Sequence, residues 1–309
     1  MNKSGSHATA YLLLTLMALF LAGNHIIGRA VHSQIPPIGL SFWRWVAGTV
    51  ILLPFALPGV FRHWPAMRDH WRVIALLGFF MIGSTTLILV ALTMTFAINV
   101  SLINALQPTL TVFFAWLILG EPLNVWRILG IGCGICGVAV MVSRGQLAVL
   151  AGFDFMTGDF IALMAMCGFA GYALNLNRLP PEIGSIPALL GIVTVGTLML
   201  LPVYLWETIA VKPVPVSVVS IGAILALALL VSVLGNLCWN AGNRMIGPSR
   251  ASIFINLIPV FGILLATTLL GEKLRAYHVF GGLLVIAGLV LAAGPGSRQK
   301  RIRPWPGTA

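Results

Sequence analysis

The sequence is poor in charge, and especially in acidic residues. Of its 309 residues, 8% are charged and seven are Asp or Glu, whereas hydrophobic residues make up 59%. A soluble globular domain carries about 25% charged residues, because its surface must be wetted by water. This chain has too little charge for such a surface. The composition therefore excludes an ordinary soluble domain and indicates a protein embedded in lipid.

Other scarce residue types narrow the chemistry. The four cysteines fall within apolar runs, where they predict small packing residues and not disulfides. Cys133 and Cys136 have the spacing of a redox or metal pair, but no further ligand lies near them in the sequence. An intramembrane enzyme would need a nucleophile–base pair or a metal cluster, which the few His and acidic residues do not supply. We therefore expect no cofactor and no enzymatic activity.

Apolar runs separated by short segments rich in proline and charge predict an all-α membrane protein with ten transmembrane helices. A spanning helix needs about 20 predominantly apolar residues, and the alternation typical of outer-membrane strands is missing. The first run continues past the length of a signal peptide, so we expect it to stay as a helix. The predicted spans are 8–30, 38–58, 72–94, 98–119, 124–143, 157–178, 185–206, 216–240, 249–270 and 275–294.

The basic residues give a net charge of +11, but their positions predict topology and not nucleic-acid binding. With the N-terminus inside, twelve of the 18 Lys and Arg fall on the inner side and five on the outer side, while Arg44 lies within a span. Inner loops of membrane proteins carry such an excess. We expect a bacterial inner-membrane location with both termini in the cytoplasm, where the basic tail 295–309 attracts anionic lipid.

Two internal offsets relate the first half of the chain to the second. The matches are Pro108 with Pro259 and Leu119-Gly120-Glu121 with Leu270-Gly271-Glu272 at an offset of 151 residues, and Ala22-Gly23 with Ala170-Gly171 at 148. The predicted halves, 8–143 and 157–294, hold five spans each, and an odd number turns the second half upside down in the membrane. Inverted repeats are typical of secondary transporters. A duplicated scaffold without transport is the alternative.

Three features of the sequence form a set: the stretch Gly23-Asn24-His25-Ile26-Ile27-Gly28-Arg29, the stretch Phe42-Trp43-Arg44-Trp45, and the Pro…Leu-Gly-Glu pattern that ends both the fourth and the ninth span. Together they resemble the EamA-type transporters of the drug/metabolite transporter superfamily. The chain departs from the family pattern at Leu21-Ala22, where a Trp often precedes the glycine. The resemblance covers roughly residues 8 to 294 and implies a ten-helix inverted-repeat carrier, often an exporter of amino acids or other metabolites. Trp239-Asn240-Ala241-Gly242 is similar to the aromatic amino acid exporter branch.

The segment Gly132-Cys133-Gly134-Ile135-Cys136-Gly137 matches the dinucleotide-binding fingerprint in its letters. That motif requires a preceding strand and a phosphate at a helix N-terminus, whereas this copy lies in the middle of a predicted span. Gly130 and Gly134 have GxxxG spacing, which lets two membrane helices approach closely. We therefore interpret the segment as a small-residue packing face.

Polar residues recur inside the apolar spans and predict a substrate site between the two halves. One polar residue in a span is explained by a hydrogen bond between helices, but polar faces on helices of both halves favour a shared aqueous cavity. Asn and His offer donors and acceptors, and Tyr and Trp offer flat apolar walls. The predicted substrate-binding residues are Asn24, His25, Arg44, Asn104, Tyr172, Asn236, Trp239 and Asn240.

Of the 18 Lys and Arg residues in the sequence, only Arg44 lies well within a predicted span, and no acidic residue is placed to neutralise its charge. A substrate carboxylate or phosphate would be a suitable partner, and the alternative is an Arg that reaches out to the near interface. Pro108 and Pro259 occupy matching positions and would kink their helices. We predict these prolines as hinges, and a kink without movement is the alternative.

The sequence thus predicts a secondary carrier that exports small zwitterionic or anionic metabolites, above all amino acids, by alternating access. The alternative substrate is a drug or lipophilic cation. The expected partners are a small-molecule substrate and membrane lipid, with no nucleic acid, and a monomer is compatible with the sequence. The acidic residues fall at or near predicted helix ends, so His25 is the candidate for a proton relay. We therefore expect transport to depend little on a proton gradient.

Overall fold

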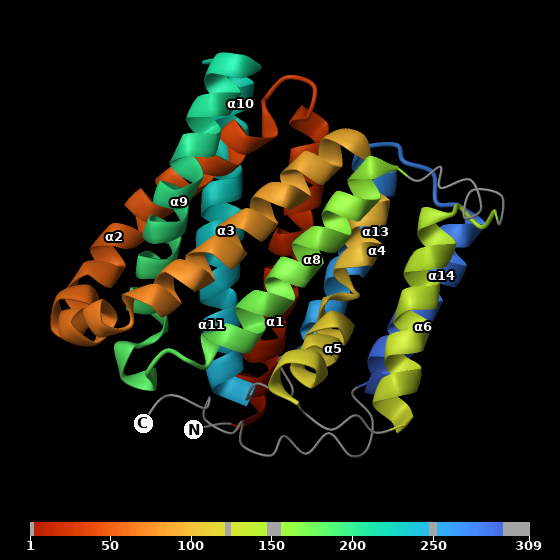
Figure 1. The fold of residues 1–309 in the computed structure, drawn as a ribbon, viewed down its shortest axis with the longest axis horizontal. Coiled ribbons are helices and arrows are strands. Elements are labelled where there is room, and N and C mark those ends of the chain that lie inside the picture. Colours follow the sequence, from red (N-terminus) through yellow and green to blue (C-terminus); the bar gives the residue numbers. More distant parts are fainter. Residues whose placement is uncertain (1–2, 121–124, 147–155, 247–251, 293–309) are drawn as a thin grey trace.

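The computed structural model describes residues 3–120, 125–146, 156–246 and 252–292, and within these ranges every regular element is a helix (Figure 1). This confirms the predicted all-α fold class. The elements are α1 Lys3–Val31, α2 Pro37–Asp69, α3 Trp71–Met94, α4 Ala97–Asn104, α5 Gln107–Leu119, α6 Val125–Val142, α8 Thr157–Leu176, η1 Pro181–Ile183, α9 Ser185–Ala210, α10 Val218–Ala226, η2 Leu227–Gly235, α11 Asn236–Ile246, η3 Ser252–Asn256, α13 Leu257–Leu269 and α14 Ala276–Ala292.

The membrane-spanning character of these helices follows from their length and apolar composition. In the described parts of the chain, 7 helices are long and apolar enough to span a membrane, or up to 8 if α4 and α5 form one bent span. Two shorter apolar helices, Phe254–Leu269 and Ala276–Leu291, cover the predicted ninth and tenth spans. The protein is therefore a multi-pass membrane protein, while the count of ten stays a prediction.

Some helices depart from the predicted spans. Helix α2 continues to Asp69, where a loop was expected after residue 58, and it bends at His63 (φ −110°), two residues before Pro65. A proline removes a backbone hydrogen bond and disfavours helical geometry at the residue before it, so it can bend a helix as well as end one, and here the helix continues past the bend. Helices α4 and α5 meet at a bend of 43°. The predicted eighth span contains a nine-residue π-helix, η2, between α10 and α11.

The helix contacts follow an approximate two-fold symmetry between the halves. Helices α2, α4 and α6, which hold the second, fourth and fifth predicted spans, pack on α9, α13 and α14, their counterparts in the second half. Helix α1 packs on α11 and α13, and its counterpart α8 packs on α3 and α4 in the same way. Helices α1 and α8 run in opposite directions, because α8 begins beside Thr95 at the end where α1 finishes (Figure 1). The repeated helical topology is thus inverted.

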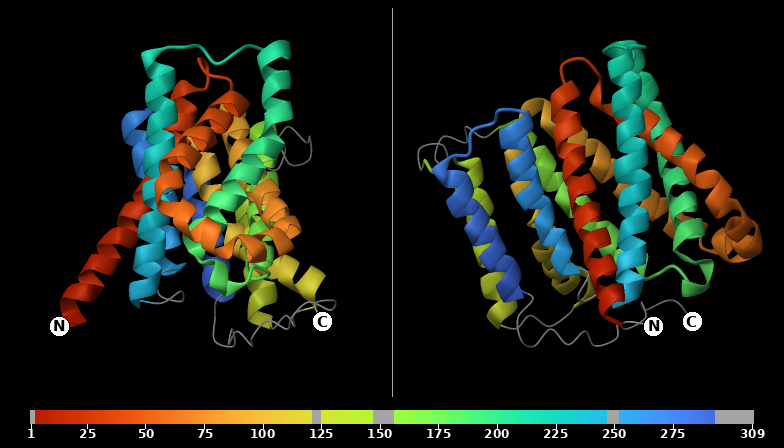
Figure 2. Two further views of the ribbon diagram at one scale, coloured as in Figure 1. Left: turned by 90° about the vertical axis from the view of Figure 1, so that its left-hand side faces the viewer. Right: turned by 180° about the vertical axis from the view of Figure 1, so that it is seen from behind.

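Helices α6 and α14 form a close pair at one side of the molecule (Figures 1 and 2). A Cβ atom added at Gly137 would lie 2.6 Å from the carbonyl oxygen of Gly281, and one added at Gly288 would lie 2.6 Å from that of Gly130. These contacts are between backbones, so only glycine fits there. Gly134 and Gly137 of the fingerprint-like segment are therefore part of a helix-packing face, as the sequence predicts, whereas a Cβ atom added at Gly132 would meet nothing within 4 Å.

Candidate functional site

Two neighbouring buried residues of α1, Asn24 and His25, contact polar residues of α2 and α4. The side chain of Arg44 is 1% exposed, and its Nη1 donates a hydrogen bond to Oδ1 of Asn24 at 2.6 Å. His25 is equally buried: its Nδ1 lies 2.9 Å from Oγ of Ser101 and its Nε2 lies 3.4 Å from Nδ2 of Asn104. A neutral imidazole that donates from Nδ1 and accepts at Nε2 fits both contacts. We call these five residues the central polar cluster.

Arg44 is only partly satisfied within this cluster. Its Nε and Nη2 are buried and have no hydrogen-bond partner among the described residues, and its Cζ lies 4.7 Å from the ring centroid of Trp45. A buried polar group without a partner costs about 1–3 kcal/mol. Nε and Nη2 share one edge of the planar guanidinium, and a carboxylate can accept from both at once. The burial also argues against an arginine that reaches to the interface.

The π-helix η2 brings a second unsatisfied group to the same face of α2. Gly48 lies one turn after Arg44, and a Cβ atom added there would lie 3.4 Å from Cβ of Ser232 in η2. The hydroxyl of Ser232 is buried and has no partner among the described residues. Short π-helical segments are frequent at functional sites. Ser232 is therefore a further candidate, contributed by the second half.

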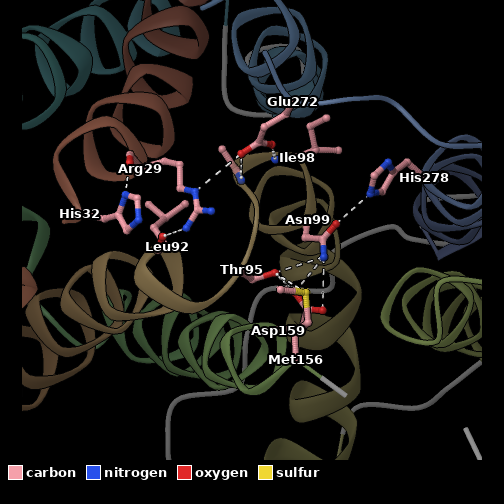
Figure 3. A network of polar contacts seen from close by, with 11 residues as sticks. Arg29, His32, Leu92, Thr95, Ile98, Asn99, Met156, Asp159, Glu272 and His278 are labelled. Carbon is pink, nitrogen blue, oxygen red and sulfur yellow. Dashed lines mark hydrogen bonds and ion pairs between the residues drawn. The ribbon is translucent and has the colours of Figure 1, made fainter. Parts of the chain in front are cut away.

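Two carboxylates of the second half hold helix ends of the first half. The term upper face is used here for the end of the molecule where α1 ends. There Glu207 accepts hydrogen bonds from the backbone N–H groups of Ile38 (3.1 Å) and Gly39 (2.6 Å), at the start of α2. Glu272 accepts from Ala97 (2.8 Å) and Ile98 (2.9 Å), at the start of α4 (Figure 3). An acidic group is favourable at a helix N-terminus, so both contacts stabilise the closure of the halves at this face.

A second network at the upper face surrounds Asp159, which lies in the first turn of α8 as the sequence predicts. Its Oδ1 accepts from Thr95 Oγ1 at 2.5 Å and from Asn99 Nδ2 at 3.1 Å (Figure 3). Asn99 Oδ1 in turn lies 2.9 Å from Nε2 of His278, whose Nδ1 accepts from the backbone N–H of Arg275. Because Nδ1 is an acceptor, Nε2 carries the hydrogen and donates it to Asn99. The network links α3, α4, α8 and α14.

Comparisons with known proteins identify the family. Residues 8–143 and 156–294 each match the EamA-like transporter family. The chain belongs to this family. It is 27% identical over 296 residues to an uncharacterized transporter, YyaM, of Bacillus subtilis (strain 168), covering 93% of this chain and 94% of that one. It is also 26% identical over 207 residues to a "Probable terminal-alkyne amino-acid exporter" of Streptantibioticus cattleyicolor, covering 67% of each chain. A solved structure with 17% identity and a TM-score of 0.56 covers 94% of the chain and shares its fold.

The EamA-like transporter brings together some of the predicted site residues and not others. Asn24 bonds to Arg44, and His25, the next residue of α1, contacts Asn104. Tyr172 packs instead with the apolar residues around Ile74 and Ile183. Trp239 packs near Leu14, which precedes Asn24 by ten residues, roughly 15 Å along an α-helix.

Two asparagines of the predicted set lie on α11. Asn236 donates to the backbone oxygen of Ser232 at 2.8 Å, so its amide serves the helix itself. Asn240 lies on the same helix, and its side chain falls outside the described residues. Ser232 is therefore the residue that the second half of the transporter offers to a site, and the sequence did not single it out.

The two predicted hinge prolines follow breaks in the transporter's helices. Pro108 lies in the first turn of α5, directly after the bend that separates α4 from α5. Pro259 lies in the first turn of α13, after the short 3₁₀ helix η3. Proline is well tolerated in a first turn, where its missing N–H has no partner to lose. The 43° bend before Pro108 agrees with the predicted kink there, whereas Pro259 follows a change from 3₁₀ to α-helix. Movement at either proline stays a prediction.

Proposed function

We propose that this EamA-like transporter exports small carboxylate-bearing metabolites, with amino acids as the preferred class, across the bacterial cytoplasmic membrane. The unsatisfied Nε–Nη2 edge of Arg44 carries this proposal. It is a permanently charged pair of donors, buried between helices and without a carboxylate of the described chain to hold it. A substrate carboxylate would complete its hydrogen bonds and neutralise its charge.

Neighbouring groups of the central polar cluster fit the remainder of such a substrate. Ser232 offers a free hydroxyl from the second half, and Asn104 offers an amide oxygen that no hydrogen bond among the described residues uses. These groups suit an amino group or a second polar group of the substrate. The likeness to a chain described as an amino-acid exporter supports the same class. A buried cation opposes a cationic substrate, because like charges repel strongly away from water.

Alternating access would exploit the inverted halves. The carboxylates Glu207 and Glu272 hold the upper face closed, and their release would open it, with the breaks before Pro108 and Pro259 as pivots. The excess of basic residues in the loops at the opposite end supports an orientation with the N-terminus in the cytoplasm and the upper face outside.

Efflux from proteoliposomes tests the proposal. Purified protein is reconstituted into vesicles loaded with a pool of amino acids, dicarboxylates and the lipophilic cation tetraphenylphosphonium, and the released solutes are identified by mass spectrometry. Release of carboxylate-bearing solutes above protein-free vesicles is expected, with loss in Arg44→Gln. Release of the cation alone would support drug efflux, and release of nothing would support a scaffold without transport.

A further inference from the structure

The upper face carries a second charged region, distinct in its residues from the central polar cluster. A hollow of about 870 Å³ lies between the upper ends of α1, α4, α6, α13 and α14. Four cationic side chains line it: Arg29, Arg144, Lys273 and Arg275. We call this hollow the upper vestibule. These four cations are four of the five basic residues that the predicted topology places on the outer side of the membrane.

The positive charge of the vestibule is only partly neutralised. Glu272 is the carboxylate in its lining, and it already accepts two backbone hydrogen bonds from α4; its contact with Nε of Arg29 is a loose 3.9 Å. Asp159, which is not part of the lining, attracts Arg144 electrostatically, but it is held by Thr95 and Asn99. Among the described residues the lining thus holds one carboxylate and four cations.

Three of the cations are exposed toward the hollow and remain available to a ligand. Arg144, Lys273 and Arg275 are exposed, and within the described ranges none has a carboxylate at salt-bridge distance. Arg29 is more committed, since its Nη1 donates to the backbone oxygen of Leu92 at 2.8 Å. Cations gathered in a concave surface focus the electric field and raise the local concentration of anions.

The backbone conformation of Arg144 supports a functional role for its side chain in the vestibule. Arg144 has φ 54° and is followed by Gly145 with φ 71°, so the chain leaves α6 through two left-handed residues. A left-handed conformation costs a residue with a side chain about 1–2 kcal/mol, and such costs concentrate at functional sites. The turn ends α6 and leaves the Arg144 side chain in the lining of the vestibule.

We propose that the upper vestibule is a binding site for a multiply charged oxyanion, a phosphate or a phosphate ester. Two arginines and a lysine without carboxylate partners suit an anion with several oxygens, because the guanidinium fork binds phosphate with two parallel hydrogen bonds. The phosphate can come from solution or from the headgroup of an anionic lipid at the membrane surface. The site is independent of the substrate proposed for Arg44.

Phosphate binding to the full-length purified protein tests this inference. Inorganic phosphate is titrated calorimetrically into protein in a neutral detergent at low ionic strength, where surface charges are least screened. The vestibule variant combines Arg144→Asn, since Asn tolerates a left-handed backbone, with Arg275→Gln. The matched control combines Arg62→Gln with Arg68→Gln, which are exposed near the other end of α2. We expect the vestibule variant to bind phosphate about ten-fold more weakly, and the control and Arg44→Gln to bind as the wild type does.

Lipid nanodiscs distinguish the two sources of the anion. If phosphatidylglycerol, compared with phosphatidylcholine, raises the thermal stability of the wild type but not of the vestibule variant, the occupant is a lipid headgroup and the site is supported. Equal phosphate affinity in wild type and vestibule variant, without that lipid effect, would overturn the proposal, as would loss of binding in Arg44→Gln or in the control. If the double variant does not fold, Lys273→Gln is tested in the same way.

Discussion

The substitution Arg44→Met separates stability from transport. Methionine keeps a long unbranched side chain but removes the charge. The variant loses the bond to Asn24, worth about 1.5–3 kcal/mol as a hydrogen bond to a charged group, and the contact with Trp45, worth about 0.5–2 kcal/mol. It also removes two unsatisfied buried nitrogens, each of which costs about 1–3 kcal/mol. These effects nearly cancel, so we expect the melting temperature to stay within about 3 °C of the wild type.

Transport should respond very differently to the same substitution. A substrate carboxylate that loses two charge-assisted hydrogen bonds should be carried about 100-fold more slowly. The assay measures the melting temperature in detergent and the efflux per folded molecule in proteoliposomes, with the exposed Arg62→Met as the matched control. A large fall in melting temperature would mean that Arg44 holds the fold together. Wild-type efflux would mean that the substrate site lies elsewhere.

Three further predictions concern packing, topology and energetics. Gly137→Ala should destabilise the protein by about 1–3 kcal/mol, because its Cβ would meet the backbone of Gly281. Gly132→Ala should not destabilise it, because nothing lies within 4 Å of an added Cβ. Thermal unfolding compares the two variants, and equal effects would contradict the packing of α6 on α14. In a variant without native cysteines, an impermeant thiol reagent added to intact cells should label Gln34→Cys but not Ser297→Cys, and the reverse pattern would invert the proposed topology. An uncoupler should leave efflux unchanged at a fixed substrate gradient. If efflux instead requires the proton gradient in the wild type but not in His25→Ala, His25 is a proton relay.

The polar residues that meet in the first half could be predicted because each interrupts an apolar run. Asn24, His25, Arg44 and Asn104 are costly in lipid, and that cost marks them in the sequence. The repeat offsets related the spans of the two halves, but they carry no signal for which of these helices pack on each other. Asn236 was predicted as a polar residue inside an apolar span, but its amide bonds back to the backbone oxygen of Ser232. Ser232 lies in the π-helix η2 close to Gly48 of α2, and the sequence did not single it out.

The networks of the upper face could not be predicted from local sequence. The acidic residues were expected at or near helix ends, and Asp159 lies in the first turn of α8. Its partners Thr95, Asn99 and His278 come from three other helices, and no spacing in the sequence connects them. Glu272 belongs to the Leu-Gly-Glu pattern that ends the ninth span, but its contact with the start of α4 depends on how the two halves meet. Such contacts arise from packing and leave no periodic signal.

The most direct test of the account compares an amino acid with its carboxamide as substrates for wild-type protein and Arg44→Gln. The two solutes differ at the carboxylate, the group that the Nε–Nη2 edge of Arg44 is proposed to bind. Wild-type vesicles should release the amino acid at least ten-fold faster than the carboxamide, in line with about 1.5–3 kcal/mol for a charged hydrogen bond. Vesicles with Arg44→Gln should lose this preference. Equal release of both solutes by the wild type, or an undiminished preference in Arg44→Gln, would contradict a carboxylate site at Arg44.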